Sequence, residues 1–488
     1  MSIGRVGFRS NAARAGLFER KMGFGIPGAV CFHHESGIGS KGGGGVQGDL
    51  PFPGRFSKMT LSDVGSLKGR IVMVRADFNV SDPGTGNIKS DARLIASVPT
   101  IRELCDSGAR VVIISHNDDP HKSANSQNTT PELAMTRLTL APVAERLGDI
   151  LGSEVRFVNE VFGDKVSDAV TALGNGQVLL LENTRSDSRD VAGDITLAED
   201  IVNSVRPEIV VIEGFSVMHR DQASVTGIAN VMRERDGRVV AGRLVEKELD
   251  VFGRRILESP ERPLVLFSGG SKVSGKEGKL KVLESLLRKV DFAVIGGAML
   301  YAFLKASGED SIGDDPLRGK TTEDDVTAAA NLLDQYADKI ILPNKVIVVK
   351  DGDVRDVTIG EDRIPKGYSI ADLSGRAAIE ISNSVGYART AVWNGDFGYT
   401  NHPDPELARK FHQGSFFILE IMKDILDEGG TVAVGGGDTG KVVKAFMEEF
   451  EFDEIPVTHV STAGGALLNL LAKGTLPGIE VIDNKQKL

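Results

Sequence analysis

Two glycine-rich segments end in lysine at the spacing of a phosphate-binding loop. Residues 270–276 (GSKVSGK) and 435–441 (GGGDTGK) match that loop up to its last position. The last position requires Ser or Thr to bind magnesium, and the chain has Glu277 and Val442 there. One glycine pair alone would indicate a tight turn. Two incomplete loops are explained better by a nucleotide site of another kind, in which backbone N–H groups and helix N-termini approach phosphate.

Polar and basic side chains follow the apolar runs of the first half of the chain. They are Asp77 and Asn79 in VRADFNV, Arg93 at the start of the next helix, His116 in IISHNDDP, Arg185 in LLLENTRSD, and His219 with Arg220 in MHRDQAS. Ligands of open α/β sheets bind outside the carboxyl ends of the strands. A single arginine is usually solvated, but three arginines and a histidine at successive strand ends favour a small, multiply anionic ligand.

The elements that must position these residues alternate along the chain. Apolar, β-branched runs of the first half are RIVMVRADF, ARVVIISH, QVLLLEN and PEIVVIEGF, and those of the second are PLVLFSG, DFAVIGG, KVIVVK, TAVWNG and TVAVGGG. Amphipathic stretches lie between them, which predicts parallel sheets covered on both faces by helices. We therefore predict an α/β fold with two doubly wound, Rossmann-like parallel sheets joined by a long helix over residues 242–258.

The same alternation predicts the domain boundaries. We expect an extension over residues 1–58, a first domain over 59–241, a second domain over 259–460, and a final segment over 461–488 that packs back on the domains. The extension has eight basic residues against three acidic ones and contains GIGSKGGGGVQGD, which is typical of a linker. Its Arg-rich, acid-poor start is typical of a transit peptide, and the alternative is a tail without an address. If the extension is a transit peptide, we expect the protein in a mitochondrion or plastid. If it is not, we expect the protein in the cytoplasm.

Composition excludes several classes of protein. The chain has 488 residues, 41% hydrophobic and 26% charged, as globular proteins have. No apolar run approaches the roughly 20 residues of a membrane helix. Two cysteines, Cys31 and Cys105, are too few for a disulfide framework. The net charge of −11 argues against a nucleic-acid partner.

From Leu61 to Ile482 the chain resembles the phosphoglycerate kinase family. The motifs that carry the resemblance occur in the family's order: VRADFNV, DARLIASVPTI, IISH, LLLENTR, HRDQASVTGIA, AGRLVEKEL, GGSKVSGK, IGGAMLYAFL, VWNGDFG, GGGDT and STAGGALL. The resemblance implies a monomeric, hinge-closing enzyme of two domains. It implies reversible phosphoryl transfer in which 1,3-bisphosphoglycerate and ADP give 3-phosphoglycerate and ATP, with Mg²⁺ bound to the nucleotide.

The resemblance also implies roles for individual residues. The acid-substrate site of the first domain corresponds to Asp77, Phe78, Asn79, Arg93, His116, Asp119, Arg185 and Arg220. The nucleotide site of the second domain corresponds to Gly270, Ser271, Lys276, Gly296, Gly297, Asn394, Asn401, Gly436, Gly437, Asp438, Thr439, Gly464 and Gly465. Catalytic roles fall to Arg93, Lys272 and Lys276, with Arg93 and Lys272 facing the transferred group. Asp438 is the implied magnesium ligand.

Some of the ligand loops depart from the family pattern. The family's SHLGRP is SHNDDP here, so that Asp119 replaces an arginine of the substrate site. The family's WNGPMGVFE is WNGDFGYTN, so that Asn401 replaces a glutamate that contacts ribose. Ser271 and Ala463 are milder changes. The retained lysines, arginines and GGGDT loop favour an active kinase. The alternatives are a weakened homologue that acts as a structural or assembly component, and an enzyme of altered acid specificity.

Overall fold

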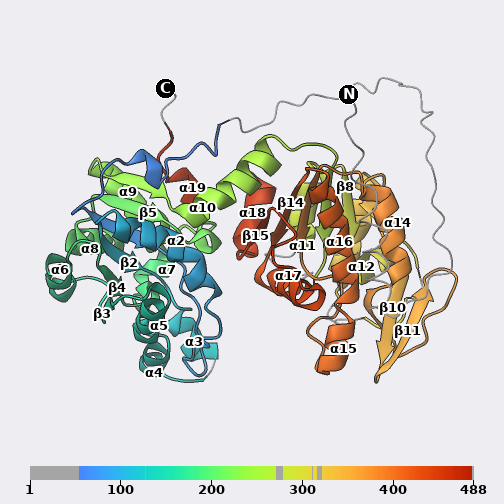
Figure 1. Cartoon of the computed structure of the whole chain (residues 1–488). Coiled ribbons are helices and arrows are strands. Elements are labelled where there is room, and N and C mark those ends of the chain that lie inside the picture. The colour runs from blue at the N-terminus through green and yellow to red at the C-terminus, as the bar shows by residue number, and fades with distance from the viewer. Residues whose placement is uncertain (1–53, 127, 271–278, 310–311, 316–320, 486–488) are drawn as a thin grey trace, which may run out of the picture. The chain divides into compact units, whose positions relative to one another are not determined.

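The computed structural model describes residues 54–126, 128–270, 279–309, 312–315 and 321–485. These residues form two parallel sheets of six strands each and a smaller antiparallel sheet (Figure 1). Helices connect the parallel strands, because parallel neighbours cannot be joined by a tight hairpin. The predicted α/β fold with two doubly wound parallel sheets is confirmed. Within the described residues, no helix combines the length and the apolar character needed to cross a membrane.

The first sheet has the strand order β3-β4-β2-β1-β5-β6. Its strands are β1 (Ile71–Arg75), β2 (Arg110–Ile114), β3 (Val155–Val158), β4 (Val178–Leu181), β5 (Ile209–Ile212) and β6 (Arg238–Ala241). Its helices are α2 (Ala92–Asp106), α3 (Pro120–Ser126), α4 (Pro131–Arg137), α5 (Ala141–Leu151), α6 (Asp164–Thr171), α7 (Arg189–Ala192), α8 (Ile195–Val205) and α9 (Ile228–Glu234). The strand order reverses at β1, which pairs with β2 on one side and β5 on the other. That reversal is where open α/β sheets bind ligands.

The second sheet has the strand order β15-β14-β13-β7-β8-β9. Its strands are β7 (Leu264–Ser268), β8 (Phe292–Ile295), β9 (Ile340–Ile341), β13 (Thr390–Asn394), β14 (Thr431–Gly435) and β15 (His459–Ser461). Its helices are α11 (Lys279–Leu287), α12 (Met299–Ala306), α13 (Glu323–Tyr336), α14 (Gly375–Val385), α15 (Pro405–Lys410), α16 (Gln413–Asp427), α17 (Gly437–Phe450) and α18 (Gly465–Lys473). The order again reverses in the middle, at β7 and β13.

One predicted strand of this second sheet lies elsewhere. The run KVIVVK is β10 (Lys345–Lys350), which pairs antiparallel with β11 (Asp353–Thr358) and β12 (Ser369–Leu373). Asp351 and Gly352 connect β10 to β11 with φ of 47° and 86°, the backbone of a two-residue hairpin turn. The assignment of this run to the parallel sheet was therefore wrong, because a local hairpin fixes its pairing.

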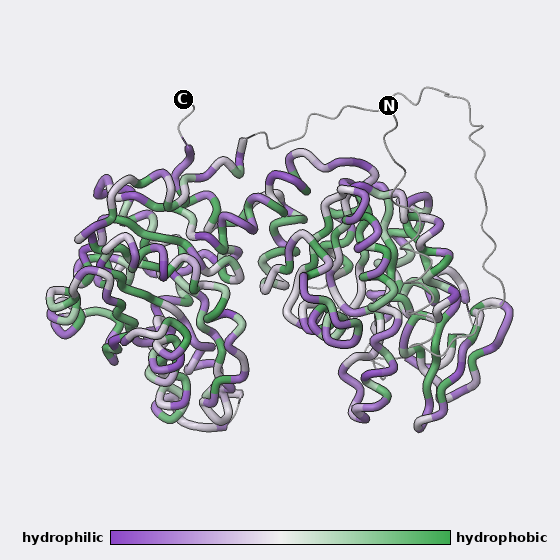
Figure 2. Tube along the Cα trace, viewed as in Figure 1, coloured by the Kyte–Doolittle hydropathy of each residue, from purple (hydrophilic) through white to green (hydrophobic). Residues whose placement is uncertain are grey.

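The strands form the centre of both hydrophobic cores. Residues of β1, β2, β5, β7, β13 and β14 are buried almost throughout, as expected of parallel strands covered on both faces. Figure 2 shows hydrophobic residues concentrated along the strands of the two sheets, with hydrophilic residues toward the surface. Charged residues at the strand ends are therefore conspicuous exceptions to an apolar interior.

A helical segment connects the two series of strands at the predicted position. It begins as α10 (Arg243–Glu248) and continues as a π-helical stretch over Leu249–Glu258. Glu248 near its middle is buried and lies 3.2 Å from His459 Nε2 in β15. The chain then returns through α19 (Pro477–Glu480), where the Gly478 N–H donates to the Met218 carbonyl of the first half at 2.8 Å. The final segment thus contacts the first half.

Candidate functional site

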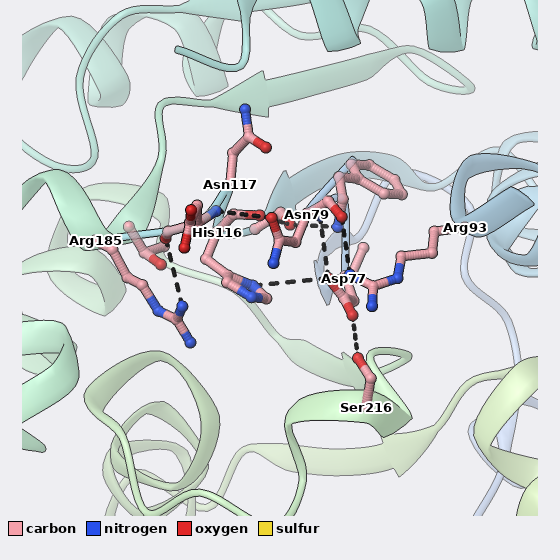
Figure 3. Close-up of polar contacts among 12 residues, drawn as sticks. Asp77, Asn79, Arg93, His116, Asn117, Arg185 and Ser216 are labelled. Carbon is pink, nitrogen blue, oxygen red and sulfur yellow. Dashed lines mark hydrogen bonds and ion pairs between the residues drawn. The ribbon is translucent and has the colours of Figure 1, made fainter. Parts of the chain in front are cut away.

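The carboxyl ends of β1 and β2 bring together an aspartate, an arginine and a histidine (Figure 3). Asp77 follows β1, His116 follows β2, and Arg93 lies in the first turn of α2. Asp77 Oδ1 accepts a hydrogen bond from Arg93 Nη1 at 3.0 Å and lies 3.8 Å from His116 Nδ1. Its Oδ2 accepts a hydrogen bond from the hydroxyl of Ser216. Because parallel strands end at one edge of the sheet, these groups meet there.

The loop that follows β1 positions Arg93 through its backbone. The Asn79 carbonyl accepts a second hydrogen bond from Arg93 Nη1 at 2.9 Å. The amide oxygen of Asn79 accepts a hydrogen bond from the Asp118 N–H at 2.9 Å, which ties this loop to the one after β2. The ring of Phe78 is fully buried in the core, and its backbone N–H donates to a serine hydroxyl at 2.8 Å. The Phe78 ring thus packs in the core of the first half, and its role in substrate binding stays a prediction.

Two buried arginines lie beside the histidine. Arg185, in the 3₁₀ turn Thr184–Ser186, donates from Nη2 to Gln222 Oε1 at 3.3 Å. Its Nη1 donates to the Asp118 carbonyl at 3.4 Å. Arg75, the last residue of β1, donates from Nε to a backbone carbonyl at 3.1 Å. Both guanidinium groups are therefore bonded mainly to neutral acceptors.

The cluster contains buried nitrogen atoms without hydrogen-bond partners, although the charge of the buried Asp190 acts on both arginines. Arg75 Nη2, His116 Nδ1 and Arg185 Nε are buried and make no hydrogen bond to any residue that the structure describes. Burial, with the charges of nearby arginines, lowers the pKa of His116 well below its usual value. Burial, followed by the charges of Arg220 and Arg75, lowers the pKa of Arg185 to about 10. Since buried cations are costly without anionic partners, the geometry suits a small, multiply charged anion.

Asp119 lies at the start of α3 beside this cluster. Its Oδ1 accepts a hydrogen bond from the Lys122 N–H at 3.1 Å, which is the bond of a helix N-cap. Its charge acts on Arg185, whose pKa it raises against the larger effects that lower it. Asp119 therefore caps a helix and also offsets part of the positive charge of the site. Its effect on substrate binding stays a prediction.

The strand-end pattern missed three residues of the cluster, Arg75, Ser216 and Gln222. Arg75 lies two residues before Asp77, and a basic residue at the end of an apolar strand was the available signal. Ser216 and Gln222 flank the predicted residue Arg220, which is exposed and donates from Nε toward its neighbouring histidine at 3.4 Å. The spacing of these residues in the sequence does not indicate which of their side chains point into the site.

Glycine-rich strand ends meet at the carboxyl edge of the second sheet. The Gly270 N–H donates to the Asp396 carbonyl at 2.7 Å, which joins the ends of β7 and β13. Gly297 has a φ of 58°, and a Cβ there would lie 2.5 Å from the Gly270 nitrogen. A Cβ on Gly296 would lie 2.1 Å from the ring of Phe397. These turns therefore require glycine because backbone and ring approach closely.

The turns after β13 and β14 are bonded to each other. Asn394 Nδ2 donates to a backbone carbonyl at the end of β14 at 2.8 Å. The Gly395 N–H donates to Thr439 Oγ1 at 2.9 Å. Gly436 has a φ of 102°, and a Cβ there would lie 4.0 Å from the Gly464 Cα. The structure thus brings Asn394, Thr439 and these glycines together at one edge of the sheet.

Two helices begin at this edge. Gly437 is the first residue of α17 and Gly465 the first of α18. Asp438, in the first turn of α17, has a side chain that is 66% exposed, and its Oδ1 accepts a bond from Lys441 Nζ at 2.9 Å. Asn401 is exposed in a turn before α15. The predicted residues Ser271, Lys272 and Lys276 lie outside the described residues.

The two sheet edges define a class of protein. A buried cationic site on one parallel sheet, and a glycine-lined edge with helix N-termini on another, are typical of a kinase that acts on a small anionic substrate. The family model for phosphoglycerate kinase matches residues 61–474. The chain belongs to the phosphoglycerate kinase family.

Relatives from bacteria and archaea support this membership. The phosphoglycerate kinase of Latilactobacillus sakei is 36% identical over 439 residues, which cover 88% of this chain and 100% of the relative. That of Corynebacterium diphtheriae is 33% identical over 434 residues, or 87% of this chain and 99% of the relative. The crystal structure of phosphoglycerate kinase from Pyrococcus horikoshii superposes with a TM-score of 0.71 at 27% identity, over 87% of this chain and 98% of that one.

Proposed function

We propose that the chain is a phosphoglycerate kinase of glycolysis and gluconeogenesis. It transfers a phosphoryl group reversibly, so that 1,3-bisphosphoglycerate and ADP give 3-phosphoglycerate and ATP. The observation that carries this proposal is the buried cationic cluster, in which three nitrogen atoms lack partners among the described residues. Carboxylate and phosphate groups of a phosphoglycerate suit such donors. The relatives give no support to the alternative of a structural component.

In the acid-substrate site, the anion is proposed to bind to Arg75, His116 and Arg185. Arg93 is proposed to stabilise the charge of the transferred phosphoryl group. Nη1 of Arg93 is held by two acceptors, and within the described residues Nε and Nη2 have none. The Arg93 side chain is 31% exposed. Its guanidinium is therefore oriented on one side and available on the other.

The chemistry requires alignment more than activation. An acyl phosphate is already reactive, so the protein supplies positioning and neutralises charge on the moving phosphoryl group. Arg93 is proposed to provide this from the first half, and Lys272 with Lys276 from the second. The glycine-lined edge with Asn394, Asn401 and Thr439 is proposed to bind the nucleotide. We also propose a monomer that binds small molecules and not nucleic acid.

Asp438 is proposed to bind Mg²⁺ together with the phosphates of the nucleotide. Mg²⁺ prefers hard oxygen ligands and usually takes one or two carboxylates plus phosphates. Asp438 offers one exposed carboxylate, and the described residues contain no group of three or more metal-ligating side chains. This donor set fits an ion that arrives with the nucleotide. Bound there, Mg²⁺ would neutralise charge on the phosphates.

Calorimetric titrations test the two sites separately. 3-Phosphoglycerate and MgADP, each titrated into the folded protein, should each bind at one site per chain. Affinity for 3-phosphoglycerate should fall as ionic strength rises, because the cationic cluster attracts it electrostatically. Folded protein that binds MgADP but no 3-phosphoglycerate would contradict the proposal for the acid site.

A further inference from the structure

Glu213 is a buried carboxyl group that the proposed chemistry does not use. It follows β5, and its side chain has no exposed surface. It lines the same small pocket as Asp77, Arg93 and Ser216. A carboxyl group in that position is notable because the neighbouring site is built to attract anions.

Hydrogen bonds connect Glu213 to two helices. Its Oε1 accepts from Thr100 Oγ1 in α2 at 2.8 Å and lies 3.4 Å from the Leu244 N–H in the first turn of α10. Thr100 Oγ1 in turn accepts from the Arg243 N–H at 2.8 Å. One side chain thus ties together the end of β5, the helix that carries Arg93, and the helix that connects the two series of strands.

The second carboxyl oxygen of Glu213 has no such partner. Oε2 is buried and accepts no hydrogen bond from the described residues. A Cβ on Gly242 would lie 1.9 Å from it, so that the backbone packs directly on the carboxyl group. Burial raises the pKa of Glu213 to about 8, although the bonds from Thr100 and Leu244 lower it. The neutral form is therefore stable at neutral pH, and ionisation falls within the range at which enzymes are assayed.

The charged groups around Glu213 determine whether the negative charge of its ionised form is neutralised. On α10, Arg243 is already bonded to Glu103 and Glu246, each at 2.6 Å. Asp77 and Arg93 line the same pocket as Glu213. Of the charges that act on Glu213, that of Arg243 lowers its pKa and that of Glu246 raises it. Because Arg243 is already bonded to two carboxylates, it balances an ionised Glu213 poorly.

We propose that Glu213 is a positioning residue of the acid-substrate site. In its neutral form it joins α2 to α10 and so holds in place the helix that carries Arg93. In its ionised form the buried carboxylate is poorly balanced, which disturbs this junction and weakens binding of the acid substrate. The inference rests on the proposed function, because it concerns the affinity for 3-phosphoglycerate.

Steady-state kinetics from pH 6.5 to 9.5 test the inference on wild type, Glu213→Gln and Thr100→Val. In wild type, KM for 3-phosphoglycerate should rise at least about threefold as the pH passes 8, whereas KM for ATP should stay level. Glu213→Gln keeps a neutral side chain of the same size and should hold the low-pH KM throughout. Thr100→Val removes the hydroxyl that bonds Glu213 and should raise KM for the acid at every pH.

The matched control is Glu208→Gln. Glu208 lies at the other end of β5, and its side chain is 50% exposed and paired with Arg70. This variant should follow the wild-type profile. A Glu213→Gln profile that also follows wild type would overturn the inference, as would a rise of equal size in KM for ATP.

A stability measurement separates this inference from the proposed function. Folding raises the pKa of Glu213 from 4.5 to about 8. The neutral carboxyl group therefore makes its full contribution to the stability of the folded state below pH 4.5. That contribution is lost as pH rises toward 8 and stays lost above it. The Tm of wild type should therefore fall relative to Glu213→Gln between pH 5 and pH 8.5. A difference in Tm between wild type and Glu213→Gln that does not change with pH would refute the titration of Glu213. If this Tm pattern is seen but the enzyme shows no turnover, the proposed function alone would be refuted.

Discussion

Arg185 offers the most direct test of the acid site at the scale of single residues. Arg185→Met removes a buried guanidinium whose Nε has no partner among the described residues. A hydrogen bond to a charged group contributes about 1.5–3 kcal/mol, so KM for 3-phosphoglycerate should rise roughly 10- to 100-fold. The control is Arg189→Met, because the Arg189 guanidinium pairs with Asp187 at 2.8 Å. Equal changes in KM for the two variants would contradict the assignment.

Asp119 has two effects that substitution can separate. Asp119→Asn keeps a side chain that caps helices well but removes the charge that acts on Arg185. KM for 3-phosphoglycerate should fall about two- to fivefold at low salt, with a smaller change at high salt because ions screen the charge. Asp164→Asn, in the first turn of α6, provides a control for the loss of one negative charge. An unchanged KM would reject an electrostatic role for Asp119.

The sequence allowed some of these residues to be predicted and not others. Asp77, Arg93, His116 and Arg185 were predictable because parallel strands deliver their carboxyl-end residues to one edge. Arg75, the last residue of β1, was not predicted although a basic residue at the end of an apolar strand was a usable signal. The Ser216 bond to Asp77 depends on a side-chain direction that tertiary packing alone decides.

At the scale of elements, the turn between β8 and α12 should tolerate no side chain. Gly297→Ala combines a φ of 58° with a Cβ that would lie 2.5 Å from the Gly270 nitrogen. We expect a loss of about 1–3 kcal/mol in the free energy of unfolding and a higher KM for ATP. Chemical denaturation and initial rates measure the two effects.

Gly308 provides the matched control for this turn. It follows the other end of α12 with a φ of 85°, and a Cβ there would meet no atom of the described residues within 4 Å. Gly308→Ala therefore has the backbone strain without the clash. It should destabilise the fold less than Gly297→Ala and leave KM for ATP unchanged. Equal losses of stability would show that the close approach to Gly270 has no effect.

The sequence assigned β10 to the parallel sheet because its apolar residues hid the alternation of buried and exposed positions. In the structure, Val346 and Val348 are fully buried while Ile347 and Val349 are partly exposed, the alternation of a strand with one covered face. All four residues are apolar, so hydrophobicity alone hid this alternation. The Asp351–Gly352 pair was a usable hairpin signal. The other predicted apolar runs correspond to β1, β2, β4, β5, β7, β8, β13 and β14, because buried parallel strands are uniformly apolar. The strands that were not predicted are β3, β6, β9, β11, β12 and β15.

At the scale of the whole chain, the Arg-rich start remains proposed as an organellar transit peptide. Phe56 is 3% exposed, and Lys58 Nζ donates to the Ile482 carbonyl at 3.3 Å. The Met59 N–H donates to the Asp483 carbonyl at 2.7 Å. A processed form should therefore retain Phe56, because these contacts hold the start of the fold to the final segment. Mass spectrometry of protein isolated from cells should show a start before Phe56, whereas an intact amino terminus would count against cleavage.

Turnover tests the central claim for the whole molecule most directly. In the proposed function each half contributes one site, so phosphoryl transfer should depend on both substrates and on Mg²⁺. In a coupled assay with 3-phosphoglycerate, ATP and Mg²⁺ at millimolar concentrations, purified folded protein should form 1,3-bisphosphoglycerate at a rate that saturates in both substrates. Omission of either substrate or of Mg²⁺ should abolish the rate. Folded protein that binds both substrates but shows no transfer would contradict the account.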